Sequence, residues 1–259
     1  MAAAPAASAS EAWKSLPHAL TQAELKPKKT PAVAGSNDWN KHCGGYPDDI
    51  SEEQAELVAK FLAACPAEQV EEMRFPMEPP LYFACRVLRA RKYDLPEAVK
   101  LVQLTTAWRR EKNVRAIREN DPFEILKSSE DEMLCFYPKT YFPLPDLEGR
   151  PIYAEKGGLS DIEALLLLVD HDMARMVDYH IYGNEVYMRN LFSEMSARAG
   201  RPVHTITTIM DMEGMSMKMI GALTRNYIAA MIGIDKEHYP ETLGKMIFVN
   251  VPGFFAMGE

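Results

Sequence analysis

Histidine and cysteine side chains are the first candidates for chemistry in this sequence, because they serve as nucleophiles, general bases and zinc ligands. The chain has six histidines and four cysteines, and none stands at the CxxC, CxxH or HExxH spacing of a metal site. The phosphate-binding glycine loops GxGxxG and GxxxxGK[ST] and the nucleophile motif GxSxG are also absent from the sequence. We therefore predict no catalytic residue, no metal ligand and no cofactor.

Three polar residues near the ends of a predicted strand leave an enzymatic interpretation open. His204, Asp211 and Glu213 lie where α/β proteins commonly place their active sites. The same residue types are also typical of turns and helix caps. The role in turns and caps is favoured, so an enzyme acting on a lipid or a small anion is the weaker alternative.

A group of basic residues stands out in this acidic chain: Arg86, Arg89, Arg91 and Lys92. The planar fork of an arginine matches the oxygens of a phosphate group, so these residues could form a local anion site. Basic residues at the end of a helix also commonly form a solvated face that stabilises the helix C-terminus. Composition alone favours the solvated face.

Methionine is frequent, with 16 residues in the chain, and several cluster between positions 210 and 219. Methionine fills irregular gaps in a core and also adapts to varied apolar ligands. The cluster therefore has two interpretations, core filler or the wall of a pocket for a flexible apolar ligand. Core filler is favoured at about two to one, since helix faces need apolar residues in any case.

The charge and the apolar runs limit the class of protein. The net charge is −8, from 37 acidic and 29 basic residues, so long-range electrostatics argue against a nucleic-acid partner. The longest aliphatic run, at 164–169, is much shorter than the roughly 18 residues that span a bilayer. The first residues lack the basic and apolar regions of a secretory signal. We therefore predict a cytoplasmic protein.

Composition divides the chain into three parts. Residues 1–47 are rich in alanine, proline and serine and have no apolar period, which predicts a disordered leader. Apolar residues then recur at three- and four-residue steps, which predicts a helical N-terminal subdomain at 48–130. Residues 131–259 mix strand and helix patterns and are predicted to form an α/β domain.

The helices of the N-terminal subdomain have recognisable ends. Ser51 and Gln54 fit a capping box that begins a helix, and this helix is expected to end before Pro66. A short helix is predicted at 67–74, and the next helix ends in the basic residues. Pro96 suits the first turn of a fourth helix.

The second half of the chain alternates strands and helices. Residues 137–139 and 142–145 contain several prolines and are predicted to be irregular. Strands are predicted at 151–155, 203–210 and 245–251, and helices at 173–199 and 217–232. Because long helices separate the strands, the strands are expected to be parallel, and the fold class is α/β with a mostly parallel sheet.

Four stretches together resemble the CRAL-TRIO lipid-binding family, in the order in which that family carries them. They are "RVLRARKYDLPEAVKLVQLTTAWRRE" at 86–111, "DLEGRPIYAEKGG" at 146–158, "TTIMDMEGMS" at 207–216 and "YPETLGKMIFVNVPGFF" at 239–255. The branch that they resemble is the phosphatidylinositol-transfer type. The resemblance covers about residues 50–259 and implies an α/β/α lipid-binding domain behind the N-terminal helices.

The resemblance also implies where a lipid binds. The sheet is expected to form the floor of an acyl-chain cavity, with the apolar run 246–249 as a buried strand and the Tyr-Pro-Glu turn at the mouth. The inositide-binding positions of the family match Arg91, Pro151 and Glu241 in this sequence.

The phosphatidylcholine-type positions of the family match Tyr153 and Thr208. Ile206, however, stands where the transfer proteins carry a serine. This departure argues against phosphatidylcholine as a second ligand.

The function implied by the resemblance is that of a carrier, which binds one phospholipid, phosphatidylinositol first among them, and exchanges it between membranes. Such a carrier is expected to be a monomer that contacts a membrane surface transiently. The alternative is a regulatory or scaffolding domain of the same family that transfers no lipid.

The family pattern continues beyond the Asn-x-Pro segment with a gate helix and a further strand, whereas this sequence stops at Glu259. We therefore expect a domain that is incomplete at its C-terminus. An uncovered sheet edge and an uncovered apolar pocket wall follow from that expectation.

Overall fold

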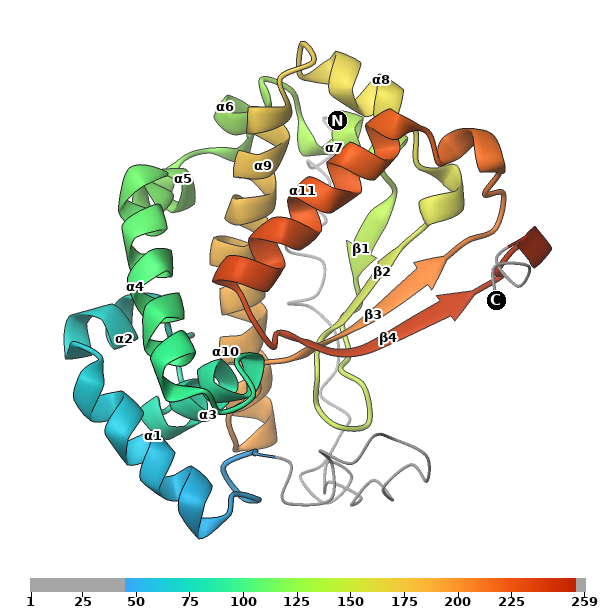
Figure 1. Ribbon diagram of the computed structural model, residues 1–259. Helices are drawn as coiled ribbons and strands as arrows, with labels where there is room; N and C mark the ends of the chain where they lie inside the picture. The colour runs from blue at the N-terminus through green and yellow to red at the C-terminus, as the bar shows by residue number, and fades with distance from the viewer. Residues whose placement is uncertain (1–44, 255–259) are drawn as a thin grey trace, which may run out of the picture.

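The computed structural model describes residues 45–254, which form a four-stranded sheet with helices packed beside it (Figure 1). The helices are α1 (Glu52–Ala64), α2 (Ala67–Met73), α3 (Pro80–Ala90), α4 (Leu95–Glu111), α5 (Val114–Glu119), α6 (Pro122–Leu126), α7 (Glu130–Phe136), α8 (Ile162–Leu168), α9 (Met173–Tyr182), α10 (Arg189–Ala199) and α11 (Ala222–His238). The strands are β1 (Lys139–Tyr141), β2 (Ile152–Glu155), β3 (Ile206–Asp211) and β4 (Leu243–Val249). The predicted α/β class is confirmed.

The N-terminal helices begin and end close to their predicted positions. The Ser51 hydroxyl accepts a hydrogen bond from the Gln54 N–H at 3.1 Å, and the Gln54 side chain accepts one from the Ser51 N–H at 2.9 Å. This confirms the capping box at the start of α1, which ends before Pro66. Asp94 caps α4 in the same way, with Pro96 in the first turn, where a missing N–H costs no helical hydrogen bond.

Helices α1 to α4 enclose an apolar core, which we call the front cluster. Its buried members are Val58, Phe61, Cys65, Val70, Met73, Phe83, Ala84, Cys85, Val87, Leu88, Ala98, Leu101 and Val102. The rings of Phe61 and Phe83 lie at its centre, 6.2 Å apart and without solvent exposure. Each helix contributes one apolar face, so the amphipathic pattern of the sequence is sufficient to explain this core.

The sheet has the strand order β1-β2-β3-β4. Strands β2, β3 and β4 are parallel, which confirms the three predicted strands and their orientation. Strand β1 pairs antiparallel with β2, and Lys139 lies opposite Glu155. The prediction of irregular structure is therefore wrong for Lys139, the first residue of β1, because this strand depends on a partner that the local sequence does not reveal.

The register defines which side chains share a face of the sheet. Side chains alternate between faces along a strand, so residues that are paired across strands point to the same side. One row runs from Tyr153 to Thr208 and Met246, and the next runs from Glu155 to Met210 and Phe248. Tyr153 packs against a buried cluster that includes residues of α10, so we call this side the helical face of the sheet.

The predicted long helix at 173–199 is confirmed, with one irregularity. Its central residues, Gly183–Met188, form a π-helix between α9 and α10. Gly200 ends the segment with a φ of 62°, a left-handed conformation that glycine adopts without steric cost. A π-helical turn often marks a functional position, and this one places Glu185 in the interior of the protein.

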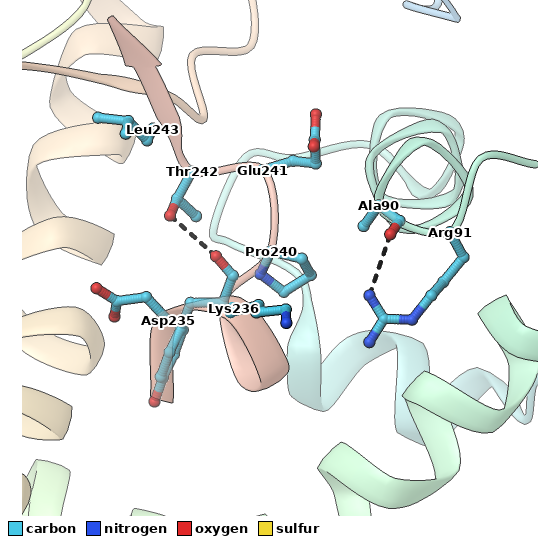
Figure 2. Close-up of a pocket in the computed structure, with 9 residues that line it drawn as sticks. Ala90, Arg91, Asp235, Lys236, Pro240, Glu241, Thr242 and Leu243 are labelled. Carbon is cyan, nitrogen blue, oxygen red and sulfur yellow. Dashed lines mark hydrogen bonds between the residues drawn. The ribbon is translucent and has the colours of Figure 1, made fainter. Parts of the chain in front are cut away.

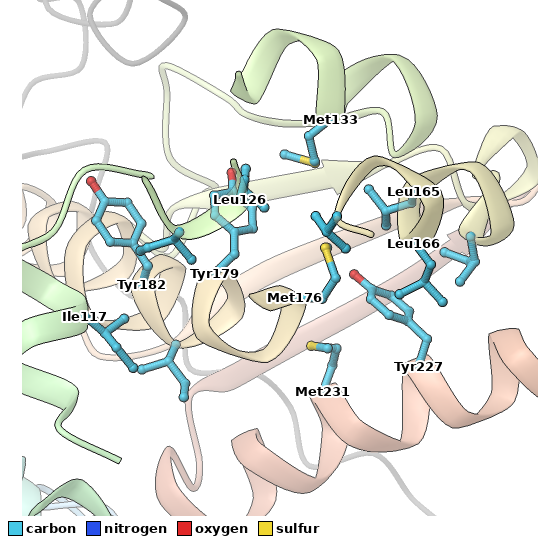
Figure 3. Close-up of a cluster of buried hydrophobic side chains, with 14 of the residues drawn as sticks. Ile117, Leu126, Met133, Leu165, Leu166, Met176, Tyr179, Tyr182, Tyr227 and Met231 are labelled. Carbon is cyan, nitrogen blue, oxygen red and sulfur yellow. The ribbon is translucent and has the colours of Figure 1, made fainter. Parts of the chain in front are cut away.

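A second apolar core joins α5 to α9 with α11 (Figure 3). Ile117 and Leu126 from the first half of the chain pack there together with Met176, Tyr179 and Met231 from the second half. The boundary between subdomains at residue 130 therefore remains a prediction, because one core includes residues from both sides of it. Most of the predicted leader, residues 1–44, lies outside the part of the chain that the structure describes.

Strand β4 does not have the burial that was expected for it. All seven of its residues are exposed, and Phe248 and Met246 have 53% and 46% of their surface accessible. The prediction that 246–249 form a buried strand is therefore wrong. The strand forms backbone hydrogen bonds with β3, but within residues 45–254 no further strand pairs with its other edge.

No helix among the described residues is long and apolar enough to cross a bilayer.

Candidate functional site

A shallow pocket of about 300 Å³ opens where α3, the end of α11 and the start of β4 meet (Figure 2). Its lining residues are Ala90, Arg91, Asp235, Lys236, Tyr239, Pro240, Glu241, Thr242 and Leu243. Two of the predicted site residues, Arg91 and Glu241, are therefore brought together although 150 positions separate them in the sequence. The lining combines charged side chains, such as Arg91, Lys236 and Glu241, with apolar surface, so it offers charged contacts to a polar headgroup.

Arg91 ends helix α3, and its guanidinium is only loosely held. One terminal nitrogen donates to the carbonyl of Ala90 at 3.1 Å, and the other lies 3.5 Å from a carboxylate oxygen of Glu237. The side chain is 22% exposed. A guanidinium with one weak acidic partner and open solvent beside it can accept an anion without breaking a buried contact.

Glu241 forms an ion pair with Arg89. Its carboxylate lies 3.2 Å from Nε of Arg89, and its backbone has a left-handed φ of 61°. Arg89 in turn lies 4.0 Å above the ring of Tyr46 and donates to the carbonyl of Gly45. Arg89 therefore fixes the carboxylate of Glu241 at the edge of the pocket, while Arg91 keeps more freedom.

Arg86 contradicts the interpretation of the basic cluster as a solvated face. It is 2% exposed and makes two hydrogen bonds to the carboxylate of Glu78, at 2.8 and 3.0 Å. Burial by itself would raise the pKa of Glu78, but the adjacent guanidinium holds this pKa below its ordinary value. Arg86 also donates to the carbonyl of Pro240 at 3.0 Å, so it holds the turn that forms one wall of the pocket.

A second buried ion pair holds the same turn from the other side. Arg109 of α4 forms two hydrogen bonds, of 2.6 and 3.0 Å, with Glu185 of the π-helix. The hydroxyl of Tyr239 donates to the same carboxylate at 2.9 Å. Sequence analysis made no prediction for Arg109 or Glu185. A local signal was present, because Glu185 stands three or four positions from Ile181 and Met188 and so shares an apolar helix face with them.

The other three predicted site residues lie on the sheet and do not line the pocket. Tyr153 and Thr208 are direct partners across β2 and β3 on the helical face. The carbonyl of Pro151 accepts a hydrogen bond from the Thr207 N–H at 2.9 Å, which positions the start of β2. Pro151 is therefore not among the residues that line the pocket, whereas Arg91 and Glu241 are. Their roles as ligand contacts remain predictions.

The enzymatic alternative finds little support in the geometry. His204 precedes β3 and Asp211 is the last residue of that strand, so the two lie on the order of 20 Å apart at about 3.3 Å per residue. The carboxylate of Asp211 accepts hydrogen bonds from the Asn250 side chain and the Glu213 N–H, as expected of a turn residue. Within residues 45–254, no three metal-ligating side chains gather into a group that could hold an ion.

The methionines show both kinds of environment. Met212 and Met231 are buried, at 6% and 8% exposure, which confirms core filling for these two. Met217 is 66% exposed, and Met246 lies on the open part of the helical face. For the exposed methionines, Met217 and Met246, the interpretation as a pocket wall stays a prediction.

The chain is similar to a known domain family and to several known proteins. Residues 136–257 match the CRAL/TRIO domain. A phosphatidylinositol/phosphatidylcholine transfer protein of Arabidopsis thaliana, SFH7, is 33% identical over 186 residues, which cover 71% of this chain and 33% of the relative. The Sec14 cytosolic factor of Schizosaccharomyces pombe is 29% identical over 171 residues, which cover 66% of this chain and 57% of the relative. The chain thus spans about a third of the first relative and little more than half of the second.

The crystal structure of Sfh5 is similar in fold. It superposes with a TM-score of 0.58 at 19% sequence identity, and the match covers 80% of this chain and 74% of the other. At this level of identity the likeness concerns the arrangement of helices and strands alone.

Proposed function

Because residues 136–257 belong to the CRAL/TRIO domain family, we propose that this chain binds one phospholipid, with phosphatidylinositol as the preferred lipid, and exchanges it between membranes. The relatives from Arabidopsis thaliana that support this proposal are named phosphatidylinositol/phosphatidylcholine transfer proteins. Under this proposal the protein is a carrier and not an enzyme, since it makes and breaks no covalent bond in its ligand.

The observation that carries the proposal is the exposed apolar strand β4. Phe248 and Met246 occupy the helical face at this edge of the sheet, and both are about half exposed. Ile228 and Ile232 of α11 add further exposed apolar surface, at 48% and 58%. Apolar surface of this extent on a folded domain marks a binding site, and acyl chains offer a matching partner.

Retention of the lipid would come from burial of its acyl chains, at roughly 0.8 kcal/mol for each CH₂ group. The headgroup would lie at the polar pocket, which adjoins the beginning of β4. Arg91 would donate charge-assisted hydrogen bonds to the lipid phosphate, for which its loosely held guanidinium is suited. We propose a monomer that works in the cytoplasm and contacts the membrane only during exchange.

The proposal is tested by lipid capture. The purified full chain is incubated with phosphatidylcholine vesicles that contain phosphatidylinositol, re-isolated, and examined by native mass spectrometry for a bound lipid. We expect one phosphatidylinositol molecule per chain. Recovery of lipid-free protein under all vesicle compositions would refute the carrier function.

Two variants with matched controls separate the apolar and the polar contribution. Phe248→Asp places a charge on the apolar surface and should abolish capture, whereas Leu147→Asp, at a loop position that is 88% exposed, should not affect it. Arg91→Ala should lower capture at least tenfold, whereas Arg110→Ala, at a 64% exposed arginine of α4, should leave it unchanged. Circular dichroism checks that each variant is folded.

A further inference from the structure

A cluster of tyrosines and charged residues occupies the β1–β2 end of the helical face. We call it the tyrosine cluster; its members are Glu130, Tyr137, Lys139, Tyr141, Tyr153, Glu155, Tyr179 and Tyr187. Sequence analysis identified only Tyr153 among them. The others come from α7, β1, β2, α9 and the π-helix, so tertiary packing alone brings them together.

Each carboxylate of the cluster is held by two phenols. An oxygen of Glu155 accepts hydrogen bonds from the hydroxyls of Tyr137 and Tyr153, at 2.8 and 2.7 Å. An oxygen of Glu130 accepts hydrogen bonds from the hydroxyls of Tyr179 and Tyr187, at 2.6 and 2.5 Å. The two acidic groups are therefore held in position by phenol hydroxyls.

Lys139 is the cation of this cluster. Its ammonium lies 4.7 Å from the ring centroid of Tyr179 and 5.6 Å from that of Tyr137. Across the residues that the structure describes, it forms no hydrogen bond and no ion pair, although Glu130 and Glu155 attract it from a longer distance. Aromatic faces together with nearby carboxylates are the arrangement by which proteins bind ammonium groups.

The cluster lies on the same surface as the exposed apolar strand. Glu155 continues across the sheet to Met210 and Phe248 in one row, and Tyr153 continues to Met246 in the next. From β1 to β4 this row spans about 14 Å, at about 4.8 Å between neighbouring strands. The helical face is thus polar and aromatic at one end and apolar at the other, as a surface for an amphiphile would be.

We propose that Lys139 determines headgroup specificity: its ammonium occupies the aromatic site of the tyrosine cluster and so excludes phospholipids with a quaternary ammonium headgroup. This inference rests on the proposed lipid-binding function. Without the lysine, two fixed carboxylates and several ring faces would form a site for an organic cation such as choline. With it, a second cation would meet like-charge repulsion in a site where two rings are already covered.

The test compares headgroup selection in the wild-type chain and in two variants. The full chain is incubated with vesicles that contain equal amounts of phosphatidylinositol and phosphatidylcholine, and the captured lipid is identified by native mass spectrometry. Lys139→Met keeps an unbranched side chain without the charge, and it should raise the ratio of captured phosphatidylcholine to phosphatidylinositol at least tenfold. Lys139→Arg keeps a cation over the rings and should retain the wild-type ratio.

A second measurement needs no substitution. Burial lowers the pKa of Lys139 to about 8, so the ammonium is mostly charged at pH 7 and mostly neutral at pH 9.5. Burial raises the pKa of the five tyrosines of the cluster above their ordinary value. The wild-type chain should therefore gain phosphatidylcholine capture at pH 9.5, and Lys139→Met should show no such change.

The outcomes distinguish the two proposals. If the wild-type chain captures phosphatidylinositol and the Lys139→Met variant selects lipids in the same ratio as the wild type does, at pH 7 and again at pH 9.5, the inference about Lys139 is wrong while the carrier function stands. Equal capture of both lipids by the wild-type chain at pH 7 would also overturn it. If neither protein captures any lipid, the carrier function and the inference both fall.

Discussion

The front cluster and strand β4 are both rich in apolar residues, but only the front cluster is buried. Phe83 of α3 has no exposed surface, whereas 53% of Phe248 of β4 is accessible to solvent. The helices around Phe83 supply apolar faces from several directions, so its burial follows from four amphipathic segments that pack together. Strand β4 pairs through its backbone on one side, and its side chains gain little cover.

The difference teaches that an apolar run in the sequence specifies a preference for burial but does not provide the surface that buries it. In the front cluster the partner surfaces lie within about 50 residues of one another. For β4 the complementary surface would be a ligand, in the function that we propose. Measurements on the two regions should therefore give opposite results for stability and for lipid binding.

The largest contrast is expected from truncating one phenylalanine in each region. Phe83→Ala removes a fully buried ring and should lower the free energy of unfolding by about 4 kcal/mol. Phe248→Ala should lower it by less than about 1 kcal/mol in the absence of lipid, because half of the ring is already hydrated. Urea denaturation of both variants measures the difference, and equal losses would show that β4 is covered in solution.

A smaller contrast in stability is expected between a buried arginine and an arginine at the rim of the pocket. Arg86→Met leaves the carboxylate of Glu78 buried without its cationic partner, with the Phe75 N–H still donating to it, and should cost about 3 kcal/mol of stability. Arg91→Met, at the rim of the pocket, should change stability by less than about 1 kcal/mol, since its ion pair is long and partly solvated. Thermal and urea unfolding at pH 7 provide the comparison. A tolerated Arg86→Met would mean that solvent reaches Glu78.

The smallest effect is the expected change in the free energy of unfolding when the pH is lowered. This measurement tests a buried histidine that has no polar partner. His204 is 7% exposed, and within the described part of the chain neither ring nitrogen has a hydrogen-bond partner. Burial lowers the pKa of His204 to about 4, whereas an unfolded histidine titrates near 6.5. The unfolded state therefore binds the proton first, and stability contributed by the neutral histidine is lost as the pH falls from 6.5 toward 4.

The matched variant for this test is His204→Phe, which keeps an aromatic ring against Tyr82. Between pH 7 and pH 5 the wild-type protein should lose about 2 kcal/mol more stability than this variant. His238, whose pKa burial also lowers to about 4, contributes to both proteins and cancels in the difference. Parallel pH dependences of the two unfolding free energies would contradict the burial of a neutral His204.

Local sequence signals account for much of the fold. Ser51 and Gln54 predict the start of α1, Pro96 the first turn of α4, and Gly200 the end of α10, because each is a chemical requirement of a helix end. The parallel strands are predictable because long helices separate them. Strand β1 was missed, since three residues between prolines form a strand only when β2 pairs with them.

The candidate site was predictable only in part. The resemblance to a lipid-binding family supplied Arg91 and Glu241, and the structure places both around one pocket. It did not supply Arg89 as the partner of Glu241, nor the buried pair of Arg109 and Glu185 behind the turn. These contacts join residues that lie 76 or more positions apart, and such separations leave no periodic signal in the sequence.

Residue types at short and fixed spacings were sufficient to predict the helix ends, the parallel α/β class and the resemblance to the CRAL-TRIO family. Only the tertiary structure decided that Arg86 is buried, that β4 is exposed, and that Lys139 lies over two tyrosine rings. Burial and ionic partnership are properties of the space between elements. That space is defined only when segments distant along the chain have packed together.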